Sequence, residues 1–282
     1  MKTFRRLTYP YIIWISIMIV IPMLLIVIYA FTKQGNDVAT LQFTLNNFRK
    51  FFTDPAFINI LWRSLRIAFV TTILCILIGY PVAYAISRSS EKRQTILILM
   101  ITLPMWINML VRTYAWIGIL ADNGVVNNIL AFIGMEPQKL LYTDFAVTLG
   151  MVYNFVPFMI LQIHSSLAKM DHNLLDAAND LGANGFQSFA RITLPLSLPG
   201  VISGITLVFL PAVSSFVIPK LLGGGAYQLI GNVIETQFIT VGEWNFGSAI
   251  SMIMAAIIML SMYITRKIDR ERDEQKESRG KA

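Results

Sequence analysis

Six long apolar stretches restrict the fold of this 282-residue chain more than any other feature of its sequence. A transmembrane α-helix needs about 20 mostly apolar residues, and each stretch is long enough to cross a bilayer. Transmembrane β-strands alternate in hydropathy, whereas these runs are continuous. The sequence therefore predicts an all-α, polytopic membrane protein with a single domain, residues 1–282. The six predicted transmembrane helices are residues 11–31, 65–86, 96–120, 145–167, 198–218 and 246–265.

The composition excludes the other broad classes of protein. Hydrophobic residues make up 55% of the chain and charged residues 14%, whereas soluble domains carry about 25% charged residues. A soluble or a disordered chain is therefore excluded. The single cysteine, Cys75, has no partner for an internal disulfide, which excludes a disulfide-stapled scaffold.

The distribution of basic residues predicts the orientation of the chain. If the N-terminus lies in the cytoplasm, most of the 23 lysines and arginines fall in inner segments, as the positive-inside rule requires. Both termini are then cytoplasmic, and residues 266–282 form a charged cytoplasmic tail. The net charge of +7 follows from this topology and indicates no nucleic-acid partner.

Two features outside this pattern predict local structure. The outer segment 32–64 is too long for a turn, and its cap-type residues before Phe48 and Phe51 predict one or two short amphipathic helices at the outer membrane surface. Gly200 and Gly204, four residues apart within a predicted span, permit close contact with a neighbouring helix.

The inner segment 168–197 is predicted to form two short helices joined at a glycine. Asp171 can cap the first helix and Gly182 can end it. Asn184 or Gly185 can begin the second helix, and Pro195 is expected to end the segment. The first helix has an apolar face that consists of Leu174, Ala177, Ala178 and Leu181. That face could pack on the chain's own membrane domain or dock a partner.

The spacing of residues in this segment is specific to one family. Asp176-Ala177-Ala178 is followed after three residues by Gly182, and after nine more by Ile192-Thr193-Leu194-Pro195. The segment resembles the EAA loop of bacterial ABC importer permeases, with Asp176 in place of the usual glutamate. The resemblance implies the type I ABC importer permease (MetI-like) fold and a coupling loop, residues 168–197, that docks on a separate ATPase. The implied ATPase-coupling residues are Asp176, Ala177, Ala178, Gly182, Phe186, Ile192, Leu194 and Pro195.

Further segments indicate a branch of this family. Residues 103–114, 221–238 and 244–247 are similar to the PotB-type spermidine/putrescine permease subunits, although thiamine, iron and opine permeases share parts of them. This resemblance implies ATP-driven import of polyamines by alternating access in a bacterial inner membrane. The implied partners are a PotA-type ATPase dimer, a second, PotC-type permease, a PotD-type extracytoplasmic binding protein and the lipid bilayer. No cofactor is expected in the chain itself, because it lacks a Gly-x4-Gly-Lys-Ser/Thr phosphate loop; Mg-ATP would be bound by the partner ATPase.

A polyamine is an elongated cation, and its passage calls for carboxylates and aromatic faces. Each such residue has a simpler alternative, as an interfacial aromatic residue or a solvated loop charge. Arg112, within a predicted span, is expected to extend toward the surface or to pair with a carboxylate or carbonyls. The candidate path residues are Trp106, Asn108, Tyr114, Asp122, Tyr153, Glu235, Glu243 and Trp244.

Other functions are less compatible with the sequence. A secondary transporter driven by an ion gradient would need acids within the membrane, and none of the 16 acids lies in the middle of a predicted span. His164 and His172 are too far apart for a metal pair on one helix, and no nucleophile–base arrangement is apparent. We therefore expect a transport subunit and no enzyme.

Overall fold

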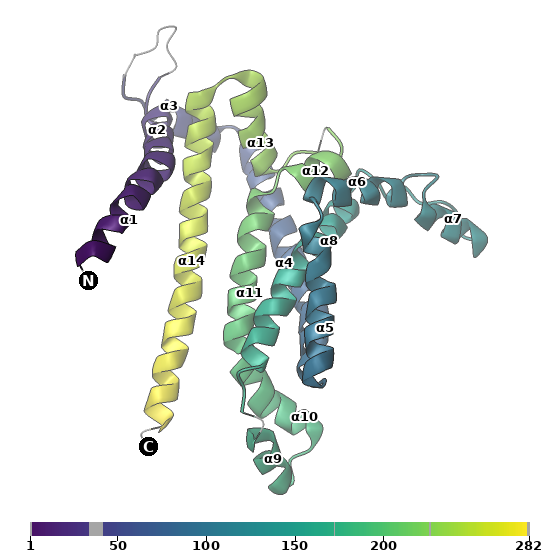
Figure 1. Cartoon of the computed structure of the whole chain (residues 1–282). Helices are drawn as coiled ribbons and strands as arrows, with labels where there is room; N and C mark the ends of the chain where they lie inside the picture. Colours follow the sequence, from purple (N-terminus) through teal and green to yellow (C-terminus); the bar gives the residue numbers. More distant parts are fainter. Residues whose placement is uncertain (1, 34–41, 172, 226, 281–282) are drawn as a thin grey trace. The chain divides into compact units, whose positions relative to one another are not determined.

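The computed structural model describes residues 2–33, 42–171, 173–225 and 227–280, and this part of the chain is almost entirely helical (Figure 1). A short π-helix, Ser16–Val20, joins the first two α-helices, and another, Gln237–Val241, follows α13. The α-helices are α1 (Lys2–Ile15), α2 (Ile21–Ala30), α3 (Asn46–Thr53), α4 (Pro55–Ser87), α5 (Glu91–Thr102), α6 (Met109–Leu120), α7 (Val125–Phe132), α8 (Asp144–Leu167), α9 (Asn173–Asp180), α10 (Gly185–Ser188), α11 (Leu194–Ser214), α12 (Val217–Leu222), α13 (Ile230–Thr236) and α14 (Trp244–Gly280).

Six helical stretches in the described residues are long and apolar enough to cross a membrane. They are Tyr9–Ala30, Pro55–Ser87, Met109–Phe132, Asp144–Leu167, Gly185–Ser214 and Trp244–Lys267. The prediction of an all-α protein with six candidate membrane helices is therefore confirmed. A short helix expected in segment 32–64 is also present, as α3.

The third predicted span, 96–120, differs because the helix is broken within it. α5 ends at Thr102, and a short 3-10 turn over Leu103–Trp106 contains Pro104. The α6 helix then begins anew, and the Asn108 side chain accepts a hydrogen bond from the Leu110 backbone N–H at 2.8 Å. A proline that interrupts the backbone bonds and an asparagine that caps a new helix give a physical reason for the break.

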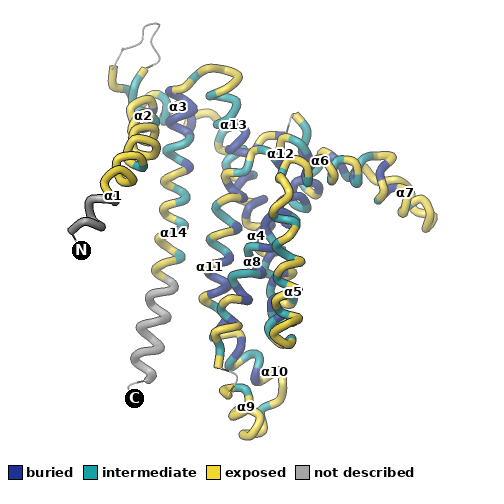
Figure 2. The backbone as a smooth tube through the Cα atoms, viewed as in Figure 1, coloured by how far each residue is buried: buried dark blue, intermediate teal, exposed yellow. Residues whose placement is uncertain are grey.

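The chain divides into two compact units. The first comprises Met1–Trp62 and Ile230–Leu260, and the second comprises Arg63–Leu229 and Ser261–Ala282. In the first unit, α1 and α2 expose apolar side chains along most of their described length (Figure 2). Such a surface suits contact with lipid tails.

Two asparagines hold the end of α2 in the first unit. The Asn47 side-chain amide donates to the Ala30 and Thr32 carbonyls at 3.0 and 3.1 Å. The Asn245 amide donates to the Tyr29 and Thr32 carbonyls at 3.0 and 2.9 Å. The last carbonyls of a helix have no partner within it, so α3 and α14 satisfy them here.

The second unit is built around α8, the most buried of the membrane helices (Figure 2). Met151, Met159 and Ile163 on α8 are fully buried. α11 packs along α8 so closely that a Cβ atom on Gly200 would lie 2.6 Å from the Gln162 carbonyl oxygen and 2.6 Å from the Ser166 Cβ. The predicted close helix contact is confirmed, and it fixes the two helices that flank α9 and α10.

We predict that Gly200→Leu destabilises the protein by about 2–3 kcal/mol, because backbone atoms of α8 leave no room for a side chain. Gly118→Leu on α6 is the matched control, because no atom lies within 4 Å of its Cβ position. Thermal unfolding in detergent measures both variants. Equal midpoints for the two would contradict this account of the contact.

Candidate functional site

The predicted helix–glycine–helix element is present at one end of the second unit (Figure 1). The Asp171 carboxylate accepts a hydrogen bond from the Asn173 backbone N–H at 3.0 Å, where α9 begins. Gly182 has φ +80° and donates its N–H to the Asn179 carbonyl at 2.9 Å, while Ala183 donates to the Ala178 carbonyl at 2.9 Å. This pair of bonds is a Schellman motif, and the left-handed backbone explains the glycine.

The second helix begins with a capping box. The Asn184 side chain accepts from the Gln187 backbone N–H at 2.9 Å, and the Gln187 side chain accepts from the Asn184 N–H at 3.0 Å. Both helices of the element are therefore terminated by local hydrogen bonds. Their geometry depends little on packing against the rest of the chain.

The expectation that Pro195 ends this segment is wrong. Helix continues from Gly185 through Ser214, with a π-helical turn over Phe189–Thr193 just before the proline. A wider turn alters the hydrogen bonding ahead of the proline ring, and a proline is tolerated in the first turn of an α-helix. α10 and α11 therefore form one continuous arm.

Aromatic contacts fix this arm to α4. The Tyr80 and Ser197 hydroxyl oxygens lie 2.7 Å apart in a hydrogen bond. The Phe189 ring packs edge-on against the rings of Tyr80 and Tyr84, at centroid distances of 5.8 and 5.5 Å. At the residue before Ser197, the Leu196 carbonyl accepts a hydrogen bond from the Ser166 hydroxyl of α8 at 3.3 Å. A force applied to α10 would thus act on α4, α8 and α11 together.

The apolar side chains at the tip of the element face outward. The Leu181 and Phe186 side chains are 89% and 78% exposed, whereas Ala178 is buried at 9%. Asp176, Ala177 and Pro195 are exposed, Ile192 is half-buried, and Leu194 is 36% exposed. A hollow of about 380 Å³ separates the two helices, and its lining residues are Ala178, Leu181, Gly182, Ala183, Gln187, Ser188, Arg191 and Ile192. Within the described residues, the apolar tip is not covered by the chain's own membrane helices.

The candidate path residues fall into two groups. The second unit holds Trp106, Asn108, Tyr114, Asp122 and Tyr153, and the first unit holds Glu235, Glu243 and Trp244. Trp106, Tyr114 and Asp122 are exposed, and Asn108 caps α6. Glu235 is half-buried on α13. A role in substrate passage therefore stays a prediction for all eight.

Among the path candidates of the second unit, Tyr153 has an aromatic and a cationic neighbour. Its ring packs edge-on against Trp116 at 5.4 Å, and the Arg112 guanidinium lies 5.9 Å from the ring centroid. The buried Nε and Nη1 atoms of Arg112 have no hydrogen-bond partner among the described residues. The expected pairing of Arg112 with a carboxylate or carbonyls is thus not seen for these atoms. The neighbour of the guanidinium is instead the face of the Tyr153 ring.

In the first unit, Glu243 and Trp244 lie at the start of α14. The Lys50 ammonium is 3.0 Å from the Glu243 carboxylate. The Trp244 ring packs edge-on against Tyr29 and Phe238, with centroids 6.2 and 5.9 Å apart. This carboxylate and aromatic group therefore places two path candidates next to an ammonium.

A charge cluster in the second unit was not singled out from the sequence. Arg63 and Arg66 of α4 each donate to one oxygen of the Asp144 carboxylate at 2.6 Å, and Asp144 begins α8. The Arg63 guanidinium also lies 3.7 Å from the Tyr227 ring centroid. Burial raises the pKa of the Tyr227 phenol, so the ring remains neutral beside the arginine. The i, i+3 spacing places the two arginines on one face of a helix, but no sequence pattern identifies their partner, which lies 81 and 78 residues away from Arg63 and Arg66.

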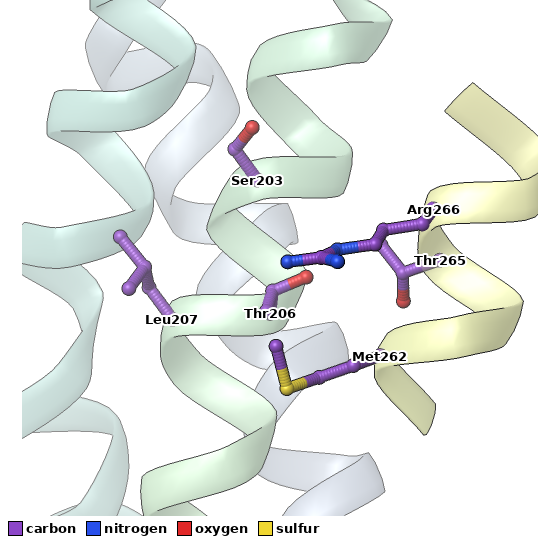
Figure 3. A pocket seen from close by; sticks show the side chains of 6 residues that line it. All are labelled: Ser203, Thr206, Leu207, Met262, Thr265 and Arg266. Carbon is purple, nitrogen blue, oxygen red and sulfur yellow. The ribbon is translucent and has the colours of Figure 1, made fainter. Parts of the chain in front are cut away.

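A second hollow, of about 270 Å³, lies between α11 and the later part of α14 in the second unit (Figure 3). Figure 3 shows the Arg266 side chain extending across it toward Thr206. A guanidinium in the hollow disfavours a cation there. The lining residues are Ser203, Thr206, Leu207, Met262, Thr265 and Arg266.

Comparisons with known proteins give consistent results. Residues 75–273 match the family described as "Binding-protein-dependent transport system inner membrane component". The chain is 38% identical to the spermidine/putrescine transport system permease protein PotB of Haemophilus influenzae, over 93% of this chain and 92% of that one. It is 35% identical to the protein of the same name from Escherichia coli, over 89% and 92%.

Solved structures show the same fold. A bacterial alginate ABC transporter, in complex with an alginate pentasaccharide-bound periplasmic protein, aligns with a TM-score of 0.75 and 19% identity, over 95% of this chain and 94% of that one. The MetNI methionine ABC transporter aligns with a TM-score of 0.59 and 16% identity, over 76% and 95%. The expected importer permease fold is therefore confirmed.

We predict that Asp144→Asn lowers the free energy of unfolding by about 1–2 kcal/mol, because two half-exposed ion pairs lose their shared carboxylate. Asp122→Asn is the control, since that carboxylate is exposed. Thermal unfolding in detergent at low and high salt measures the loss, which should shrink as salt screens the wild-type pairs. A salt-independent loss would argue against the ion pairs as its cause.

Proposed function

Because the chain belongs to the family of binding-protein-dependent transport system inner membrane components, we propose that it imports polyamines as a permease subunit driven by a separate ATPase. Membership of this family makes it a multi-pass membrane transport subunit. The substrate, the ATPase and the orientation are the proposed parts. We place the α9–α10 end of the second unit in the cytoplasm, as the basic residues favour.

The observation that carries the proposal is the exposed tip of the α9–α10 element. Leu181 and Phe186 present apolar side chains to solvent beside a hollow, within the segment that matches the EAA pattern. Exposed apolar groups at a rigid, locally capped tip suit a docking surface for another protein. The chain has no phosphate-binding loop of its own, so nucleotide would be bound by the docked ATPase.

The anchoring contacts suggest how docking could drive transport. A movement of α9 and α10 passes directly into α11, because the helix is continuous through the π-helical turn. The close contact at Gly200 then moves α8 together with α11, and the Tyr80–Ser197 hydrogen bond moves α4 with them. Closure of two ATPases would thus tilt these helices as one body, which is the kind of motion that alternating access needs.

The proposed substrate rests on the relatives and on chemistry. Two relatives at 35–38% identity over about nine-tenths of the chain are named as spermidine/putrescine permeases. Carboxylate and aromatic groups suited to alkylammonium ions lie around Glu243 and Trp244. The proposed assembly contains an ATPase dimer, a second homologous permease and an extracytoplasmic polyamine-binding protein. The aligned alginate transporter is likewise described with a bound periplasmic protein.

Uptake by the complete importer tests the substrate. The chain is expressed with its neighbouring transport genes in cells that lack other polyamine importers, and uptake of radiolabelled spermidine is measured. We expect uptake that unlabelled spermidine and putrescine compete and thiamine does not. Competition by thiamine alone would assign another solute. Uptake that resists ATP depletion but is abolished by an ionophore would indicate a secondary transporter.

We predict that Phe186→Asp reduces ATP-driven uptake at least about tenfold, because an exposed Phe side chain that becomes buried on docking contributes about 1.5–3 kcal/mol. The side chain is 78% exposed in the chain alone, so the thermal stability of the isolated subunit should not change. The matched control is Phe132→Asp on α7, which is 91% exposed and lies far from the element in sequence. Normal uptake by the Phe186 variant would remove the proposed docking role.

A further inference from the structure

The Lys50 side chain of α3 occupies a site built from groups that recognise an ammonium ion. Its Nζ atom lies 3.0 Å from the Glu243 carboxylate oxygen and 4.3 Å from the centroid of the Phe246 ring. The Lys50 and Glu243 side chains are 47% and 35% exposed. Solvent and solutes can therefore reach both partners of this pair.

The aromatic wall of the site is rigid. Phe246 is only 2% exposed, and the Phe57 ring packs edge-on against it at a centroid distance of 5.0 Å. Next to Glu243, the half-exposed Trp244 ring is held by Tyr29 and Phe238. Hydrogen bonds from the Asn245 amide fix the start of α14 to the end of α2. Both rings and the start of α14, next to Glu243, are thus held by contacts that do not involve the lysine.

This arrangement is chemically suited to one class of ligand. A carboxylate beside an aromatic face binds a primary alkylammonium through an ion pair and a cation–π contact. The lysine side chain is itself a butylammonium group, the same four-carbon amine that forms one end of spermidine and that putrescine carries with a second amine. Lys50 therefore fills the site as a tethered copy of a polyamine end.

We propose that Glu243 and Phe246 form a polyamine-binding site and that Lys50 is its internal competitor, which an arriving polyamine displaces. The inference rests on the proposed function and adds a specific site and a control element to it. A solute with a single weakly held charge does not readily displace a tethered amine. A polyamine brings a second ammonium, for which the exposed Trp244 ring offers another face. The tether thus favours multiply charged amines over simple ones.

The competition between Lys50 and a polyamine can be measured as a change in the dissociation constant of the polyamine. A side chain tethered next to its site acts at an effective concentration on the order of millimolar, so its removal should strengthen polyamine binding by about tenfold. A purely structural ion pair behaves differently, because loss of either partner then has the same effect. If Lys50 competes with the polyamine and Glu243 binds it, removal of the Lys50 ammonium should strengthen polyamine binding and removal of the Glu243 carboxylate should weaken it.

Equilibrium binding of radiolabelled spermidine to the assembled importer in nanodiscs, without its binding protein, tests this site. We expect Lys50→Gln to lower the dissociation constant about tenfold and Glu243→Gln to raise it beyond the measurable range. The double variant should resemble Glu243→Gln. Arg49→Gln is the matched control, because it removes one positive charge from the same helix without touching Glu243. Putrescine should compete, and uncharged butane-1,4-diol should not.

The outcomes separate this site from the proposed function. Equal dissociation constants for wild type, Lys50→Gln and Glu243→Gln would overturn the site, even if the wild-type importer carries spermidine. Weaker binding in both single variants would instead assign the pair a structural role and also overturn it. A wild-type importer that takes up no polyamine would overturn the proposed function. Thermal unfolding midpoints of the variants exclude loss of folding as the cause.

Discussion

The close approach of α11 to α8 at Gly200 is the constraint on which the rest of the second unit depends. Backbone atoms of α8 lie where a side chain on Gly200 would be. The absence of a side chain lets two membrane helices meet almost backbone to backbone, where van der Waals packing is strongest. The α9–α10 element connects these same two helices, so its position follows from their contact.

The element at the end of this helix pair is shaped by its own hydrogen bonds. The Schellman motif at Gly182 and the capping box at Asn184 define both helices without help from burial. Leu181 and Phe186 can therefore remain exposed without loss of local structure. Local caps at the tip and tight packing at the base are the combination expected of a part that transmits force between proteins.

Much of this could be predicted from the sequence, because it depends on local signals. Hydropathy predicted the six candidate spans, and the positions of Asn184 and Gly182 predicted the two short helices of the coupling segment. Pro195 was misjudged because a π-helical turn, which has no clear sequence signal, precedes it. The break near Asn108 was missed because the apolar run continues through it. Lys50 and Glu243 are 193 residues apart, and only the folded chain brings them together.

Site-directed cross-linking at the tip tests the central claim most directly, that the α9–α10 element docks an ATPase. The native Cys75 is fully buried, so a cysteine introduced by Leu181→Cys would be the accessible thiol. A short bifunctional cross-linker applied to inside-out membrane vesicles should join this position to the partner ATPase, with a yield that changes when ATP is bound. The account would be contradicted if no ATPase were captured, or if the introduced thiol reacted only from the extracytoplasmic side.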